Sequence, residues 1–270
     1  MKTAFSTIGC PGWTWNEIFA TAKDMGLDGI EIRGIGPEIY APKAEPFSEK
    51  NRAATLERLQ KANVAISMVT SGACLGRSKD MEASMAEAKN YVDFAGEIGA
   101  PYVRVMISDT PEGYPDEDVE GAAERYQALC AYAKGTGVDV LIETNGKLAD
   151  SRVMRRFLDS VDAANKGVLW DIHHPYRFYG EKPGYTYENI GEYVRYIHVK
   201  DSVGTSKKVE YRMMGYGDVP IFDTLKILSE NGYAGYVSLE WVKRWNPDLQ
   251  EPGVVFYHYA NYIRFLMNQL

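Results

Sequence analysis

Short apolar runs rich in β-branched residues recur along the chain at regular intervals. Each run is followed by a segment whose apolar residues recur at helical spacing, or whose first residues are typical of a helix N-terminus. The eight runs are AFSTIG, DGIEIRG, AISMVTSG, YVRVMIS, DVLIETN, VLWDIHH, YIHVKDS and YVSLEWV. This pattern predicts eight strands, each followed by a helix.

The segment after the first run begins with a capping box. Thr14 is followed three residues later by Glu17, and Ile18, Ala22 and Met25 then recur at helical spacing. Comparable signals predict further helices over residues 48–62, 80–98, 116–134, 150–165, 186–194, 221–231 and 251–270.

Eight strand–helix units within 270 residues predict a single (β/α)8 TIM barrel in the α/β class. No linker rich in proline or serine and no shift in composition divides the chain, so we expect one domain over residues 1–270. An open doubly wound sheet is the alternative, although that fold has no preference for eight regular units.

Polar residues within the predicted strands follow a regular alternation. The outward face of a barrel strand packs beneath helices and must be apolar, so polar strand residues should point into the barrel. On the second strand, Ile30 and Ile32 alternate with Glu31 and Arg33. The same rule turns inward Arg104 on the fourth strand and then, near the ends of four consecutive strands, Glu143, Asp171, His198 and Glu240.

The last four of these side chains would share the C-terminal face, where TIM-barrel active sites lie. Three converging carboxylates repel one another and are costly to desolvate, so they must be protonated, pair with a base or bind a cation. Three carboxylates with one imidazole suit Mn²⁺ or Mg²⁺, with Zn²⁺ and Co²⁺ as alternatives. The competing interpretation is that Arg33, Arg104 and Lys200 neutralise the acids internally.

Five stretches carry a family resemblance, in order along the chain: GLDGIEIRG, LIETNG, WDIHHP, YIHVKDS and MGYGDVPIFDTLKILSENGYAGYVSLEW. The chain resembles the sugar phosphate isomerase/epimerase family of the xylose isomerase-like TIM barrels. That group includes ketose 3-epimerases, hydroxypyruvate isomerases, inosose isomerases and dehydratases, and endonuclease IV. The resemblance covers essentially the whole chain. It implies that one divalent metal ion is bound by Glu143, Asp171, His198 and Glu240.

The resemblance also implies an activity: a metal-dependent isomerase or epimerase of a small sugar, keto-sugar or cyclitol. A metal that holds the substrate's carbonyl and hydroxyl oxygens stabilises an enediolate, and two carboxylates on opposite sides of the carbon can remove and return its proton. Glu143 and Glu240 have this relation by resemblance. The same intermediate can expel a leaving group, so a dehydratase or lyase acting on an inosose or a 3-keto-glycoside is the alternative.

Two adjacent histidines follow the sixth strand. Strand alternation would place His173 on the face of Asp171, whereas the family pattern matches His174 to a histidine that binds a sugar oxygen beside the metal. Pro175 should hold His174 in an extended conformation at the end of the strand. We therefore expect His174 to bind substrate and His173 to be a packing residue.

Three basic residues complete the predicted substrate site: Arg33, Arg104 and Lys200. Lys200 shares the inward face of His198, so it either contacts substrate or neutralises a carboxylate. Residues 203–220 form a long connection that could supply a replacement base or a lid, or could be a solvated loop; its basic residues are Lys207, Lys208 and Arg212. Its GYGD turn could hold a phosphate through backbone amides. Four aromatic residues near predicted strand ends could stack on a sugar ring or pack in the core: Trp13, Tyr176, Trp241 and Trp245.

Two positions depart from the pattern of the ketose 3-epimerases. Those enzymes carry a second glutamate six residues past the strand-five ligand and an arginine six residues past the strand-seven histidine. The corresponding residues here are Ala149 and Gly204. These departures count against that subfamily.

The composition counts against nucleic-acid binding as a function. A formal net charge of −7 provides no basic field for nucleic acid. Hydrolysis of DNA as in endonuclease IV is a remote alternative, because it needs extra histidines on early strands, and the third and fourth strands have none. A barrel that binds sugar without turnover would share the same sequence features.

No segment approaches the roughly 18 apolar residues of a membrane span, and the N-terminus lacks the apolar core of a signal peptide. We therefore expect a cytoplasmic protein that binds neither membranes nor nucleic acid, with a small carbohydrate as its partner. Homodimers and homotetramers are common among such barrels, and the sequence favours neither. The scattered Cys10, Cys74 and Cys130 predict buried thiols rather than disulfides or a zinc site.

Overall fold

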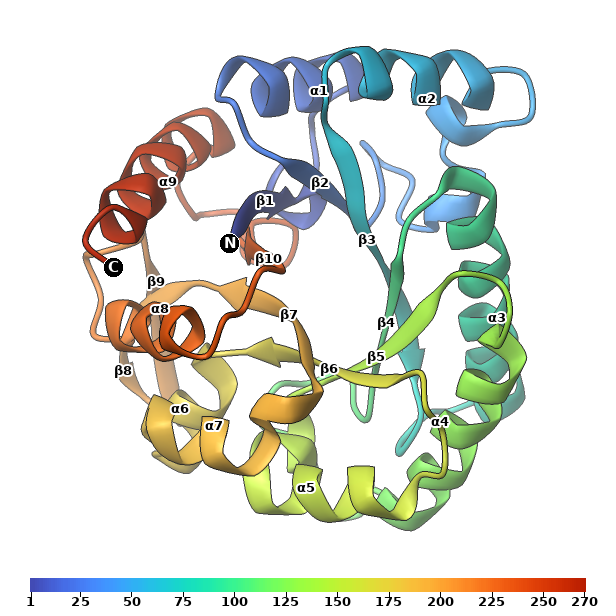
Figure 1. Cartoon of the computed structure of the whole chain (residues 1–270), viewed down its shortest axis with the longest axis vertical. Coiled ribbons are helices and arrows are strands. Elements are labelled where there is room, and N and C mark those ends of the chain that lie inside the picture. The colour runs from blue at the N-terminus through green and yellow to red at the C-terminus, as the bar shows by residue number, and fades with distance from the viewer.

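The computed structural model describes all 270 residues, and its central feature is a closed barrel of parallel strands inside a ring of helices (Figure 1). The strands follow one another around the barrel in the order β1-β10-β7-β6-β5-β4-β3-β2. The predicted TIM barrel is therefore confirmed. The barrel strands are β1 (Lys2–Ser6), β2 (Gly29–Ile32), β3 (Ala65–Cys74), β4 (Tyr102–Met106), β5 (Asp139–Glu143), β6 (Lys166–Asp171), β7 (Val194–Val199) and β10 (Tyr236–Leu239).

All eight predicted helical segments contain a helix. The capping box of Thr14 and Glu17 forms with both hydrogen bonds in place, and Asp80, Asp118 and Asp150 cap the helices that follow them. None of the helices is long and apolar enough to cross a bilayer. The predicted helices are observed as α1 (Trp15–Asp24), α2 (Arg52–Lys61), α3 (Met81–Ile98), α4 (Val119–Ala133), α5 (Ser151–Ser160), α7 (Pro183–Ile190), α8 (Ile221–Glu230) and α9 (Pro252–Met267).

Strand alternation separates an apolar outer layer from a polar inner one. The outward residues, such as Ile30, Ile142 and Ile197, belong to one large core between the sheet and the helices. Inside the barrel, a separate apolar cluster that includes Leu141 and Tyr196 fills the N-terminal half. The charged side chains of the predicted site lie beyond this cluster, toward the C-terminal half. The cysteines are free and buried, as predicted.

A short helix, α6 (His173–Tyr179), begins where a continued strand was predicted. The expectation that Pro175 keeps His174 extended is wrong, because Ile172 already has helical angles (φ −67°, ψ −22°) and both histidines lie in the helix. Proline is tolerated in the first turn, where its missing N–H would have no helical acceptor. The helical rotation, rather than strand alternation, decides which histidine faces the barrel.

Residues 201–212 form a β-hairpin, so the expectation of a solvated loop is wrong for this part of the connection. The strands β8 (Asp201–Thr205) and β9 (Lys208–Arg212) pair antiparallel outside the barrel. Gly204 has a φ of +107°, and a Cβ on it would collide with the carbonyl oxygen of Lys208. The hairpin therefore leaves no room for an arginine at this position.

The GYGD turn does not offer its amides to a phosphate, contrary to the suggestion from the sequence. The amides of Gly215 and Gly217 donate to Oδ2 of Asp201 at 2.8 and 2.9 Å. The amides of Ser202 and Val219 donate to its Oδ1 at 2.9 and 3.3 Å. The buried Asp201 carboxylate thus occupies the position that a phosphate would take and fixes the connection from β7 to α8.

Replacing Asp201 with alanine should lower the free energy of unfolding by about 2–4 kcal/mol, because several buried N–H groups lose their acceptor. Urea denaturation at pH 7 measures this loss. Asp248→Ala is the control, since this exposed acid forms no ion pair, and its effect should stay within about 0.5 kcal/mol. Equal effects of the two substitutions would show that Asp201 does not hold this segment.

Candidate active site

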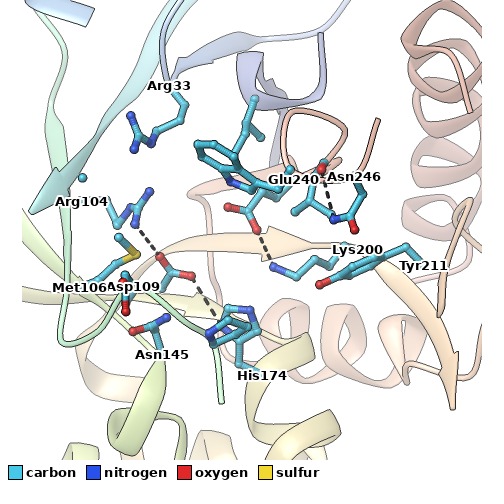
Figure 2. Close-up of a pocket in the computed structure, with 16 residues that line it drawn as sticks. Arg33, Arg104, Met106, Asp109, Asn145, His174, Lys200, Tyr211, Glu240 and Asn246 are labelled. Atoms are coloured by element: carbon cyan, nitrogen blue, oxygen red, sulfur yellow. Dashed lines mark hydrogen bonds and ion pairs between the residues drawn. The ribbon is translucent and has the colours of Figure 1, made fainter. Parts of the chain in front are cut away.

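A cavity of about 510 Å³ opens at the C-terminal ends of the barrel strands (Figure 2). Asp171 and His198 lie at its floor and are fully buried. The structure therefore brings all eight predicted site residues to one place. The other six line the cavity: Arg33, Arg104, Glu143, His174, Lys200 and Glu240.

A group of possible metal ligands converges at this floor. One ligand atom each from Glu143, His198 and Glu240 lies within 4.8 Å of the others. Nδ1 of His198 is 3.5 Å from Oε1 of Glu240 and 3.9 Å from Oδ2 of Asp171, and it has no hydrogen-bond partner. The register of the sheet places Asp171 directly beside His198, on neighbouring strands.

The other nitrogen of His198 orients the ring. Nε2 lies 2.9 Å from Oε2 of Glu31, which also accepts a hydrogen bond from Ser238. When Nε2–H donates to Glu31 and Nδ1 is deprotonated, the Nδ1 lone pair faces the carboxylates. Metal-ligating histidines are held in this way by a carboxylate. The unpartnered nitrogen and the oxygen-rich donor set therefore fit a divalent cation.

Basic side chains already pair with some of these acids. The ammonium group of Lys200 lies between Asp171 and Glu240 and forms an ion pair with each. Nη1 of Arg104 lies 3.3 Å from Oε2 of Glu143. Internal neutralisation, the competing interpretation from the sequence, thus holds for Lys200 and Arg104.

Burial and charge shift the pKa values of the floor residues in opposite directions. Burial raises the pKa of Glu143 to about 7, and Arg104 opposes this shift. Burial also acts to raise the pKa of Glu240, but Lys200 and His198 outweigh it and hold that pKa below its usual range. Burial lowers the pKa of His198, yet the attraction of Glu31 and Glu240 brings it to about 9. The metal-free site therefore holds protons that a metal must displace.

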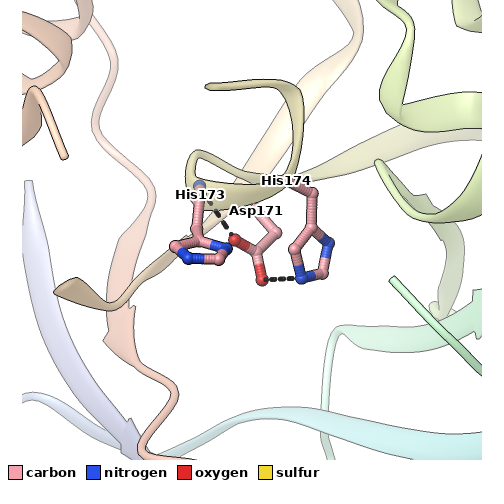
Figure 3. A group of neighbouring side chains, drawn as sticks. All are labelled: Asp171, His173 and His174. Carbon is pink, nitrogen blue, oxygen red and sulfur yellow. Dashed lines mark hydrogen bonds and ion pairs between the residues drawn. The ribbon is translucent and has the colours of Figure 1, made fainter. Parts of the chain in front are cut away.

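His173 and Asp171 belong to a second group that could hold a metal (Figure 3). Nε2 of His173 lies 2.9 Å from Oγ of Ser202, and that oxygen accepts hydrogen bonds from Arg177. The Ser202 hydroxyl must then donate to Nε2, which leaves the proton of His173 on Nδ1. No lone pair of His173 remains for a metal. Its ring packs against Tyr211, which lines the cavity, but His173 itself does not line it.

His174 faces the cavity. Its Nδ1 lies 2.8 Å from the carbonyl oxygen of Thr144, so it donates there and Nε2 carries the lone pair. Nε2 is 3.4 Å from Oδ2 of Asp171. Burial and the nearby Lys200 lower the pKa of His174, which keeps the ring neutral. A neutral Nε2 can accept a hydrogen bond from a sugar hydroxyl above the floor.

Several lining residues were not identified from the sequence. Tyr211 comes from β9, and Asp109, Asn145 and Asn246 come from segments that follow barrel strands (Figure 2). Asn145 stands two residues past Glu143, where position after a strand end could have suggested it. The same signal applies to Asp109, three residues past the end of β4, whereas Tyr211 and Asn246 carry no such signal and reach the cavity only through the tertiary fold. Of the four aromatic residues suggested as stacking residues, Trp245 lines the cavity and is 58% exposed. Trp241 lies in the core, and Trp13 and Tyr176 pack against it.

Comparison with known proteins shows the family and the fold of the chain. The family model of the xylose isomerase-like TIM barrels matches residues 19–255. The chain is 27% identical to fructoselysine 3-epimerase of Shigella flexneri over 254 residues, which cover 90% of each protein.

Two solved structures share the fold. The crystal structure of the IOLI protein with a bound zinc atom superimposes with a TM-score of 0.82 at 15% identity, over 100% of this chain and 99% of that one. A probable 3-DHS dehydratase from Bacillus anthracis superimposes with a TM-score of 0.80 at 15% identity, over 98% of this chain and 99% of that one.

Proposed function

Since the chain belongs to the xylose isomerase-like TIM barrel family, we propose that it is a divalent-metal-dependent isomerase or epimerase of a small sugar, keto-sugar or cyclitol. The observation that carries the proposal is the convergence of Glu143, His198 and Glu240 on the floor of the cavity. The similarity to a curated fructoselysine 3-epimerase supports a sugar as the substrate.

The ion would be held by Glu143, Asp171, His198 and Glu240. Once bound, a divalent cation stabilises the negative charge that develops on a carbonyl oxygen. Mn²⁺ is our first choice because carboxylates outnumber imidazoles among the ligands, with Mg²⁺, Co²⁺ and Zn²⁺ as alternatives. The proposal includes a cytoplasmic enzyme with no nucleic-acid or membrane partner.

Two carboxylates carry out the proton transfer. Glu143 removes the proton from the carbon beside the carbonyl, and the electron pair of that C–H bond moves into the enediolate. In an isomerisation the same carboxyl group returns the proton to the neighbouring carbon, and the hydroxyl proton moves from the oxygen that becomes the new carbonyl to the former carbonyl oxygen. In an epimerisation Glu240, which enters the turnover protonated, donates a proton on the opposite face, and exchange with solvent then removes the proton from Glu143 and restores that of Glu240. His174 orients the substrate by accepting a hydrogen bond from a hydroxyl group.

Exchange with solvent deuterium tests the proposal. The Mn²⁺-loaded protein is incubated in D₂O with a panel of ketoses, inososes and 3-keto-glycosides, and NMR follows the carbons next to the carbonyl. We expect deuterium at one such carbon in recovered substrate or product. The absence of deuterium from every compound in the panel would contradict the proposal.

Dehydration or β-elimination is the second candidate. Two positions count against a ketose 3-epimerase and thereby support this alternative: Ala149 and Gly204 cannot supply the glutamate and arginine of those enzymes, and Gly204 has no room for a side chain. The same NMR experiment separates the two, because elimination yields an unsaturated or dehydrated product.

The affinity for Mn²⁺ should rise with pH. Ligation requires His198 to lose a proton below about pH 9 and Glu143 to lose one below about pH 7. The association constant should therefore increase about tenfold per pH unit between about pH 7 and 9, and more steeply below that range. Calorimetry in buffers of different ionisation enthalpy measures both the affinity and the protons released. A constant affinity from pH 6 to about pH 9 would contradict this ligand set.

A further inference from the structure

One wall of the cavity carries an unusual concentration of positive charge. Arg33 and Arg104 both line this wall, one from the end of β2 and the other from β4 (Figure 2). Arg33 has no carboxylate within 4 Å, and its Nη1 donates only to the carbonyl oxygen of Ile39 at 3.3 Å. Arg104 is 4% exposed in its side chain, yet its Nε has no hydrogen-bond partner. Buried guanidinium groups are costly without such partners.

No acid forms an ion pair with Arg33. Glu87 instead accepts a hydrogen bond from the amide of Gly72 at 2.6 Å, and Asp109 is exposed at the cavity and forms no ion pair. Burial and the adjacent Arg104 lower the pKa of Arg33, Tyr91 and Glu87 oppose this shift, and Arg244 adds to it. Arg244 also has no carboxylate partner, since its Nη2 donates to the carbonyl oxygen of Gly36 at 2.6 Å.

The carboxylates at the floor of the cavity cannot balance the charge of Arg33. A divalent ion and the Lys200 ammonium together would balance the charge of Glu143, Asp171 and Glu240. The positive charge of Arg33 would then still have no partner in the protein. Guanidinium groups bind carboxylate and phosphate through two parallel N–H donors, so such a wall is suited to an anion.

We propose that the substrate is an anionic sugar derivative whose carboxylate or phosphate is held by Arg33 and Arg104. This inference rests on the proposed function, in that the remainder of the substrate would be the sugar that reaches the floor. A carboxylate suits the wall better than a phosphate, because phosphate sites commonly add backbone amides. The amide of Gly72 is occupied by Glu87, and those of the GYGD turn are occupied by Asp201.

Three ketoses with the same reacting end test the proposal: D-fructose, D-fructuronate and D-fructose 6-phosphate. Calorimetry with the Mn²⁺-loaded protein measures their binding, and NMR in D₂O measures exchange. We expect at least one anionic sugar to bind about ten- to a hundredfold more tightly than fructose. Arg33→Met should reduce this preference by about tenfold or more, and Arg33→Lys should restore part of it.

Arg156→Met is the matched control. This arginine is exposed on α5, forms no ion pair and does not line the cavity, so its loss should leave the preference at the wild-type value. Added NaCl should weaken the binding of the anionic sugars more than that of fructose.

The outcomes separate the two proposals. Equal binding of all three sugars, with deuterium exchange, would overturn the anion site and leave the isomerase function intact. Arg33-dependent binding of an anionic sugar without exchange would support the anion site and contradict the isomerase function. Tighter binding of the phosphate than of the carboxylate would support the site and overturn the choice of group. Binding of none of the three would overturn the proposal.

Discussion

Replacing Glu143 with glutamine should lower the rate of solvent deuterium exchange by about a thousandfold, the effect typical of losing a general base. The glutamine has the same shape and retains an oxygen near the metal position, but it cannot accept the proton. The rate is measured by NMR at saturating Mn²⁺ and saturating substrate, so that weaker binding does not imitate a loss of chemistry. Exchange within about tenfold of the wild-type rate would assign the base to another residue.

Glu181→Gln is the matched control for this experiment. Glu181 is also a buried carboxylate, but it accepts hydrogen bonds from the Ser151 amide at 2.9 Å and the Thr186 hydroxyl at 2.6 Å, away from the cavity. We expect this variant to melt at a lower temperature while the folded fraction retains the wild-type exchange rate. If the wild-type protein binds a sugar and catalyses no exchange on it, the barrel is a binding protein, and the catalytic roles of Glu143 and Glu240 must be withdrawn.

Replacing His198 with alanine should abolish most of the rise in melting temperature that Mn²⁺ produces. At a hundredfold excess of Mn²⁺ over its Kd, a ligand that binds only the folded chain contributes about 2.7 kcal/mol. His174→Ala should retain most of this stabilisation and instead lose turnover. Both variants lose a buried ring, which by itself lowers the melting temperature. The quantity to compare is therefore the rise in melting temperature that Mn²⁺ produces in each variant, not the absolute melting temperature.

His258→Ala is the control for the two histidine variants. Its Nε2 lies 2.7 Å from the carbonyl oxygen of Met214, and its ring stacks on Tyr262 outside the cavity lining. Mn²⁺ should therefore raise the melting temperature of this variant as much as that of the wild-type protein. Loss of the metal effect in His174→Ala together with its retention in His198→Ala would reverse the assigned roles. The ligand set would then have to be redrawn around residues 169–175.

The barrel and the composition of its floor could be predicted from the chain alone, because both depend on strand alternation. A barrel strand has a period of two residues and an apolar outer face, so each polar residue such as Glu143 or His198 is directed inward by its position. The closure of eight parallel strands then brings the ends of neighbouring strands together. For this reason seven of the eight residues proposed from the sequence lie around one cavity, and the eighth, His174, reaches it from α6.

Contacts between distant segments could not be predicted in this way. Glu31 and His198 meet although 167 residues separate them, and Tyr211 reaches the cavity only through the hairpin. The sequence suggested Arg33 as a site residue but gave no sign that its charge has no partner in the fold.

Local geometry also decided two assignments that the pattern of residues left open. After Asp171 the chain turns into α6, so the face of each histidine follows the helical rotation and not the strand period. The amides of the GYGD turn are occupied by Asp201, which lies 14 and 16 residues before the two glycines that donate to it. Periodicity determines which side of a strand a residue occupies, whereas the partner of a polar group depends on which segments the folded barrel brings within hydrogen-bonding distance.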